Sequence, residues 1–99
     1  MEIIRTNFFK GQLRDISFHI AKDKIGASKL FRRELNISID NLVNFPFKYR
    51  QSYYYVDENI RDMTFNGYSV IYRVNQEKVV IEILEIFNRN MPRLDNSYE

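Results

Sequence analysis

The chain has 99 residues, a formal net charge of +2, and 44% hydrophobic and 15% aromatic residues. This composition predicts one small folded domain spanning residues 1–99, and it excludes a disordered chain. The absence of cysteine excludes disulfides and thiolate metal sites and agrees with a reducing, cytoplasmic location. No apolar run is long enough to span a membrane, and the first ten residues do not resemble a signal peptide.

The N-terminal part predicts a short strand and then an amphipathic helix. Glu2–Arg5 forms the strand, and Asn7 stands where a helix N-cap is expected, since its side chain can accept from free backbone N–H groups. Apolar residues then recur at helical spacing and define one buried stripe: Phe9, Leu13, Ile16 and Ile20. Gly26 follows a polar run and predicts the turn that ends this helix.

A second helix is predicted from about Ala27 to Val43. Its buried stripe consists of Phe31, Leu35, Ile39 and Leu42. Phe45-Pro46 ends the helix, because the residue before a proline is pushed out of the helical region. The short connection predicts that the two helices form an antiparallel hairpin.

The rest of the chain predicts strands. Apolar and aromatic residues alternate in four segments, Tyr53–Tyr55, Ile60–Phe65, Tyr68–Val74 and Val79–Phe87. Asn66-Gly67 predicts a tight type I′ turn between the middle two, because both central residues of that turn need positive φ. The last segment is the most apolar, so it should lie inside the sheet. Glu82 and Glu85 interrupt its alternation, which predicts a bulge near Leu84.

The resulting fold class is α+β: an N-terminal strand and an antiparallel helical hairpin, packed on one face of an antiparallel sheet of three to four strands. The residues expected to be buried together in its core are Phe9, Leu13, Ile16, Phe31, Leu35, Ile39, Ile81 and Ile83. The polar tail from about residue 88 contains Pro92 and is expected to be irregular.

Three segments, in this order of elements, resemble toxins of the RelE/ParE superfamily. Phe45–Arg50 is similar to the exit from the second helix, Ile60–Met63 with Gly67–Val74 to the central hairpin, and Val79–Arg89 to the last strand with its following basic residue. The resemblance implies a toxin of a type II toxin–antitoxin system, with growth inhibition or plasmid stabilisation as its role. It also implies a hetero-oligomer in which a cognate antitoxin holds the toxin inactive.

The superfamily contains two activities on one fold, so the fold does not decide between them. RelE-like members cut messenger RNA on the ribosome without a metal ion, whereas ParE-like members poison DNA gyrase. For a nuclease, Arg61 and Arg89 match basic catalytic residues of RelE-like enzymes. Ser69 and Met63, however, stand where two further basic residues are expected.

Each missing cation would remove a few kcal/mol of transition-state stabilisation. The sequence therefore favours a ParE-like, non-nucleolytic and gyrase-directed toxin. The alternatives are a RelE-like ribosome-dependent mRNA endonuclease and an inactive homologue that only binds its antitoxin.

Further candidate contacts with the target or with nucleic acid are Lys48, Arg50, Arg73 and Tyr98. Structural roles compete with these functional ones: Arg61 could pair with Asp62 or Glu82, and Arg73 could be a solvated cross-strand residue. The three tyrosines of Tyr53–Tyr55 could stack on bases, but few basic residues are interleaved with them, so packing on the sheet or an antitoxin contact is favoured. Neither a metal ion nor another cofactor is expected.

Overall fold

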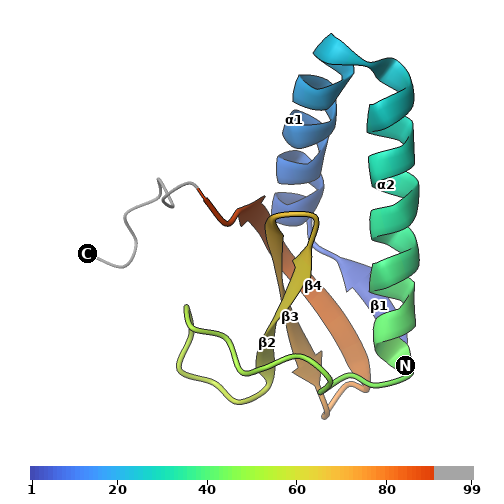
Figure 1. The fold of residues 1–99 in the computed structure, drawn as a ribbon. Helices are drawn as coiled ribbons and strands as arrows, with labels where there is room; N and C mark the ends of the chain where they lie inside the picture. The colour runs from blue at the N-terminus through green and yellow to red at the C-terminus, as the bar shows by residue number, and fades with distance from the viewer. Residues whose placement is uncertain (91–99) are drawn as a thin grey trace.

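The computed structural model describes residues 1–90. Along the chain lie β1 (Glu2–Arg5), α1 (Asn7–Asp23), α2 (Ile25–Asp40), a 3-10 turn η1 (Asn41–Val43), β2 (Ile60–Phe65), β3 (Tyr68–Asn75) and β4 (Val80–Asn88). The strands form one sheet in the order β1-β4-β3-β2. The two helices form an antiparallel hairpin that packs on one side of the sheet (Figure 1). The α+β class is thus as predicted.

The first helix is capped one residue earlier than expected. Thr6, not Asn7, is the N-cap, with an extended backbone and a hydroxyl that accepts from the N–H of Phe9 at 3.2 Å. The same hydroxyl donates to the carbonyl of Ile83 at 2.8 Å. Thr6 therefore starts α1 and attaches it to β4, which an asparagine one residue into the helix could not do.

The connection between the helices is a single residue. Lys24 is extended, with φ −149° and ψ 114°, and α2 begins directly after it at Ile25. The predicted turn at Gly26 and the predicted start at Ala27 are therefore wrong, since Gly26 lies inside α2. An extended residue needs no glycine, so this turn leaves no compositional signal.

The predicted core is confirmed, with one residue at its margin. Of the predicted residues, Ile16 is partly exposed and packs against the others. The other seven are buried together: Phe9, Leu13, Phe31, Leu35, Ile39, Ile81 and Ile83. The sheet adds Met63, Val70, Tyr72, Val74 and Ile86 to the same cluster. The core therefore lies between the helical hairpin and one face of the sheet.

The hairpin β2–β3 and its neighbour β4 pair as predicted. Asn66 and Gly67 have φ of 46° and 83°, which confirms the tight turn with two positive φ angles. Ile71 is opposite Glu85, whereas Tyr72 is opposite Ile83, so Leu84 is the extra residue of the predicted bulge. β4 is an internal strand, as expected from its apolar sequence.

β1 differs from the antiparallel sheet that was predicted. It pairs with β4 in parallel, with Ile3 opposite Ile81, so the sheet is mixed. A parallel pair needs a long crossover connection, which here consists of both helices and two strands. Local sequence patterns carry no information on such a distant pairing.

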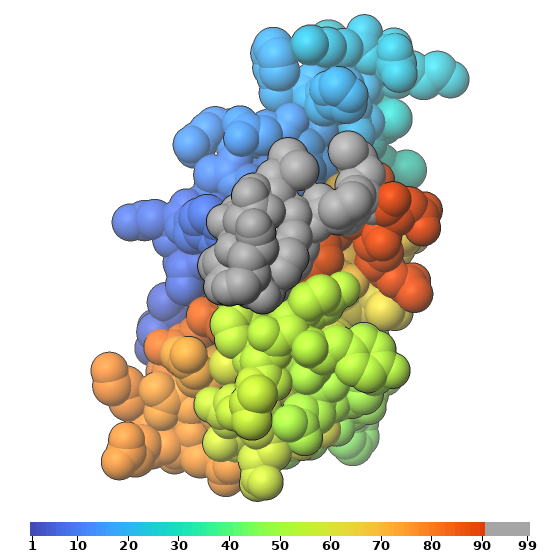
Figure 2. Space-filling model, turned by 90° about the vertical axis from the view of Figure 1, so that its left-hand side faces the viewer, coloured from blue at the N-terminus to red at the C-terminus, as the bar shows by residue number. Residues whose placement is uncertain are grey.

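The predicted strand at Tyr53–Tyr55 is wrong. Residues 53–56 form a bend, and only Gln51 pairs with β2, through a single bridge to Arg61. Segment 50–59 instead passes over the sheet face that is turned away from the helices, here called the outer face, and is visible in yellow-green in Figure 2. There Tyr54 meets the ring of Phe87 edge-on at 5.1 Å, and the hydroxyl of Tyr55 donates to Glu85.

Candidate functional site

Tyr72 fastens the chain segment that follows α2 to the sheet. Its hydroxyl is buried and donates to the carbonyl of Pro46 at 2.6 Å. Burial raises the pKa of Tyr72 well above its usual range, although the nearby charge of Arg61 acts in the opposite direction. The hydroxyl therefore remains a protonated hydrogen-bond donor and is unsuited to act as a general base.

Arg61 stabilises the same segment from β2. Its Nε donates to the carbonyl of Glu58 at 2.9 Å, and Nη1 donates to the carbonyl of Tyr49 at 3.0 Å. Its guanidinium lies over the ring of Phe47, 4.8 Å from the centroid. Arg61 thus binds backbone carbonyls, while Asp62 and Glu82, the carboxylates considered from the sequence, pair with other arginines.

Asp62 binds Arg50 on the outer face. The Asp62 side chain is 1% exposed, and its Oδ2 lies 3.0 Å from Nη2 of Arg50. The same oxygen accepts from the backbone N–H of Tyr53 at 3.1 Å. The guanidinium of Arg50 stacks on the ring of Tyr53, 3.1 Å from the centroid. One buried carboxylate therefore holds both partners of an arginine–tyrosine stack.

Arg73 is part of a cross-strand pair. It is opposite Glu82 in the β3–β4 register, and Nη1 lies 3.1 Å from Oε1 of Glu82. Because both side chains are partly exposed, solvent screens this ion pair and it contributes little to stability.

The structure does not bring the two nuclease candidates together. Arg61 is opposite Tyr72, in the middle of β3, whereas the backbone N–H of Arg89 donates to the carbonyl of Gly67, in the turn before β3. Tyr72 and Gly67 are five residues apart, which corresponds to about 17 Å along a strand. Tyr98 lies outside the described residues.

The two positions that lack the expected cations are closed to solvent. Met63 is fully buried in the core beneath the helices. Ser69 is 5% exposed and lies opposite Phe87, on the other side of the sheet. The two side chains therefore lie on opposite faces of the sheet and do not contribute to one exposed surface.

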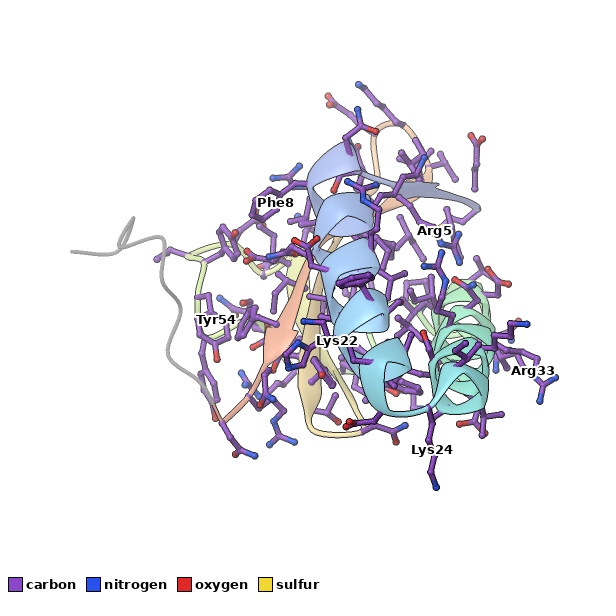
Figure 3. All side chains as sticks on the ribbon, turned by 90° about the horizontal axis from the view of Figure 1, so that it is seen from above. Arg5, Phe8, Lys22, Lys24, Arg33 and Tyr54 are labelled. Atoms are coloured by element: carbon purple, nitrogen blue, oxygen red, sulfur yellow. The ribbon has the colours of Figure 1, made fainter. Side chains whose placement is uncertain are left out.

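A groove between the helices was missed by the sequence analysis. It encloses about 590 Å³ and is lined by four cations, two polar residues of α2 and an apolar floor: Arg5, Lys10, Arg14, Arg32, Asn36, Asp40, Phe9 and Leu13. Arg5 reaches across to α2, where Nη2 lies 3.2 Å from Asp40 and 3.3 Å from Asn36. In the view from above, Arg5 lies between the helices, whereas Arg33 points away from α1 (Figure 3).

The spacing of the charges contains a signal that could have revealed this groove. Lys10 and Arg14 are four residues apart on α1, and Arg32, Asn36 and Asp40 follow each other at the same spacing on α2. Arg32 also contacts the neighbouring helix α1. In the structure its Nη1 is 3.4 Å from the hydroxyl of Ser17 on the neighbouring helix.

Within residues 1–90, no cluster of three or more His, Cys, Asp or Glu side chains has a geometry suited to a metal ion. No helix in this part of the chain is both long and apolar enough to cross a membrane.

The fold has a counterpart among solved structures. The fold is similar to that of a solved structure described as the chromosomal ParDE TA system from P. aeruginosa, with a TM-score of 0.71 and 16% sequence identity. The match covers 89% of this chain and 95% of that one. No curated protein matches the sequence.

A sequence model of the ParE toxin of the type II toxin–antitoxin system parDE matches residues 3–93. The chain therefore belongs to the family of ParE toxins of type II toxin–antitoxin systems. This confirms the superfamily inferred from the sequence and favours the ParE-like interpretation over the RelE-like one. An antitoxin is the partner that such a system implies.

Proposed function

We propose that this chain is a cytoplasmic toxin that inhibits growth by acting on DNA gyrase and does not cut RNA. The separation of Arg61 from Arg89 is the observation that supports this most strongly. Cleavage of RNA without a metal ion needs groups that transfer protons and donors that stabilise the phosphate charge, all close to one scissile bond. Two arginines whose backbones are about 17 Å apart along the sheet do not supply that arrangement.

The state of Arg61 supports the same conclusion. Two of its donors bind the carbonyls of Glu58 and Tyr49, and its guanidinium covers Phe47. These contacts fix the guanidinium on the backbone, so Arg61 would have to release the two carbonyls in order to turn toward a phosphate. Its role in the proposed function is to shape the segment after α2.

A pair of assays with the purified, antitoxin-free chain tests this proposal. In the first, gyrase supercoils relaxed plasmid; in the second, translating ribosomes carry a defined message. We expect loss of supercoiling and accumulation of cleaved DNA, with the message intact. Arg89→Ala should leave both results unchanged, whereas a nuclease would lose message cleavage with this substitution. Message cleavage by the parent protein would refute the proposal, and a chain without effect on growth would be an inactive homologue.

We further propose that the antitoxin places an acidic segment in the groove between α1 and α2, forming a hetero-oligomer. Four cations line this groove, against the single carboxylate of Asp40 among the described residues. Phe9 and Leu13 also line the groove but are almost fully buried. An acidic segment would therefore bind chiefly by complementing the charge of the groove.

A further inference from the structure

Exposed aromatic and apolar side chains gather in the segment that follows α2. Of the thirteen large hydrophobic side chains that are exposed within residues 1–90, five lie between positions 45 and 56. They are Phe45, Phe47, Tyr53, Tyr54 and Val56, and we call this set the aromatic segment. A concentration of exposed apolar residues in one segment is typical of a protein interaction surface.

Tyr53 is the most exposed aromatic residue of this segment, with 79% of its surface accessible. Its ring is nevertheless held in place. Arg50 stacks on one face of the ring, and the Oδ2 atom of Asp62 binds both the Arg50 guanidinium and the Tyr53 backbone N–H. The backbone of Arg50 is fixed as well, since its carbonyl accepts from the N–H of Asp62 at 3.2 Å.

This arrangement has an energetic cost that the core does not require. The Oδ1 atom of Asp62 is buried and has no hydrogen-bond partner among the described residues. A buried carboxylate with an unsatisfied oxygen is destabilising, and an apolar side chain would fill the same place on the sheet more favourably. The carboxylate instead immobilises an exposed tyrosine, so less conformational entropy is lost when a partner binds that residue.

The charge of the region indicates the class of partner. Positions 45–62 contain three basic residues, Lys48, Arg50 and Arg61, and three acidic ones, Asp57, Glu58 and Asp62. A nucleic-acid strand would require an excess of positive charge. A neutral surface with exposed tyrosine and an arginine stack instead has the composition of a protein–protein hot spot.

We propose that the Arg50–Tyr53 stack is the central contact that this toxin makes with its protein target, and that Asp62 is the positioning residue of that contact. This rests on the proposed function only in requiring a protein target. The surface is distinct from the proposed antitoxin groove, because β1, which contributes Arg5 to the groove, and β2 are opposite edges of the sheet. Target and antitoxin thus contact different parts of the toxin.

Tyr53→Ala tests the proposal, with Phe18→Ala as the matched control. Phe18 is also an exposed aromatic residue, at 67%, and carries a cation, Lys22, over its ring at 5.4 Å, but it lies on α1. The purified full chains are compared for inhibition of gyrase supercoiling and for growth arrest after induced expression. We expect Tyr53→Ala to weaken inhibition by at least about 30-fold, as for a hot-spot residue, and Phe18→Ala to act like the parent. Thermal unfolding of each variant accompanies the assays.

The outcomes separate this inference from the choice of gyrase. If the parent arrests growth without affecting supercoiling, gyrase is not the target, and loss of growth arrest in Tyr53→Ala still supports the contact. Equal potency of the parent, Tyr53→Ala and Phe18→Ala overturns the inference. Equal loss in both variants also overturns it, because the effect would not be specific to the stack. Tyr53→Phe should retain most of the activity, because the stacked ring remains.

Discussion

The groove between the helices and the aromatic segment between α2 and β2 are held in place in different ways. The groove is lined mainly by side chains of regular helices, and its charge is strongly positive. The aromatic segment has almost no regular structure, and the surrounding positions 45–62 carry equal numbers of basic and acidic residues. It is kept in place by three side chains of the sheet, Arg61, Asp62 and Tyr72.

This difference indicates two kinds of recognition. A cationic groove attracts an acidic partner over a distance and loses affinity as salt rises. A neutral aromatic surface acts only at contact, through the burial of pre-positioned rings. One small toxin can therefore present two partners with surfaces that share the same core but respond differently to salt and to substitution.

The largest expected effect comes from a substitution in the core, which should disrupt the groove and the aromatic segment together. Leu35 is fully buried in the core between helices and sheet. Leu35→Ala should lower the free energy of unfolding by about 2–5 kcal/mol, because it removes apolar contacts and leaves a cavity. Urea unfolding measures this, and a change below 1 kcal/mol, well under that range, would show that the core is not packed as described.

Reversal of charge in the groove should weaken antitoxin binding without altering the aromatic segment. Lys10 and Arg14 are exposed, so the double variant Lys10→Glu/Arg14→Glu should fold normally. We expect its affinity for the cognate antitoxin to fall by about 10- to 100-fold at low salt, and by less at high salt. Calorimetry at two salt concentrations measures this. Arg33→Glu, on the side of α2 that faces away from α1 (Figure 3), is the control and should change little.

Loss of the Tyr72 hydroxyl should affect the attachment of the aromatic segment. Tyr72→Phe leaves the Pro46 carbonyl without its donor and should reduce stability by about 1–2 kcal/mol near neutral pH. Since burial raises the pKa of Tyr72, the parent keeps this contribution below about pH 10 and loses it as the pH rises further. The free energy of unfolding, measured from pH 7 to 11, should therefore fall less steeply with pH in Tyr72→Phe than in the parent. Parallel curves for the two proteins would contradict this.

The smallest expected effect concerns Val79, which belongs to neither the groove nor the aromatic segment. Val79 has φ of 56°, which is strained for a β-branched residue. Val79→Gly should raise stability by about 0.5–1 kcal/mol, since relief of strain exceeds the added entropy of the unfolded chain. Val56→Gly, at an exposed valine without positive φ, should give no such gain. Equal thermal midpoints for Val79→Gly and the parent would show that the strain is negligible.

Local signals in the sequence were sufficient for much of the fold. The apolar spacing around Leu35, the Asn66-Gly67 turn and the bulge at Leu84 depend on neighbours within a few residues, and all three are confirmed. The helix connection at Lys24 was missed, because an extended single residue has no preferred amino acid. The parallel pairing of β1 was missed because its partner lies at the other end of the chain.

The candidate site was less predictable, because its features arise between elements. Arg32 becomes part of a groove only when α1 and β1 lie beside it. Tyr53 was judged to lack interleaved basic residues, yet folding stacks Arg50 on its ring. Arg89 follows the last strand as expected, but the antiparallel register separates it from Arg61 in β2. The roles of Lys48 and Arg50 at a target stay predictions.

The parallel pairing of β1 with β4 has a consequence for synthesis on the ribosome. β1 leaves the exit tunnel well before β4, since Ile3 and its partner Ile81 are separated by most of the described chain. Because long-range pairing must await the distant strand, a nascent chain cannot complete its sheet until β4 has emerged. A chain that stalls before that point therefore lacks the finished sheet and the core that depends on it.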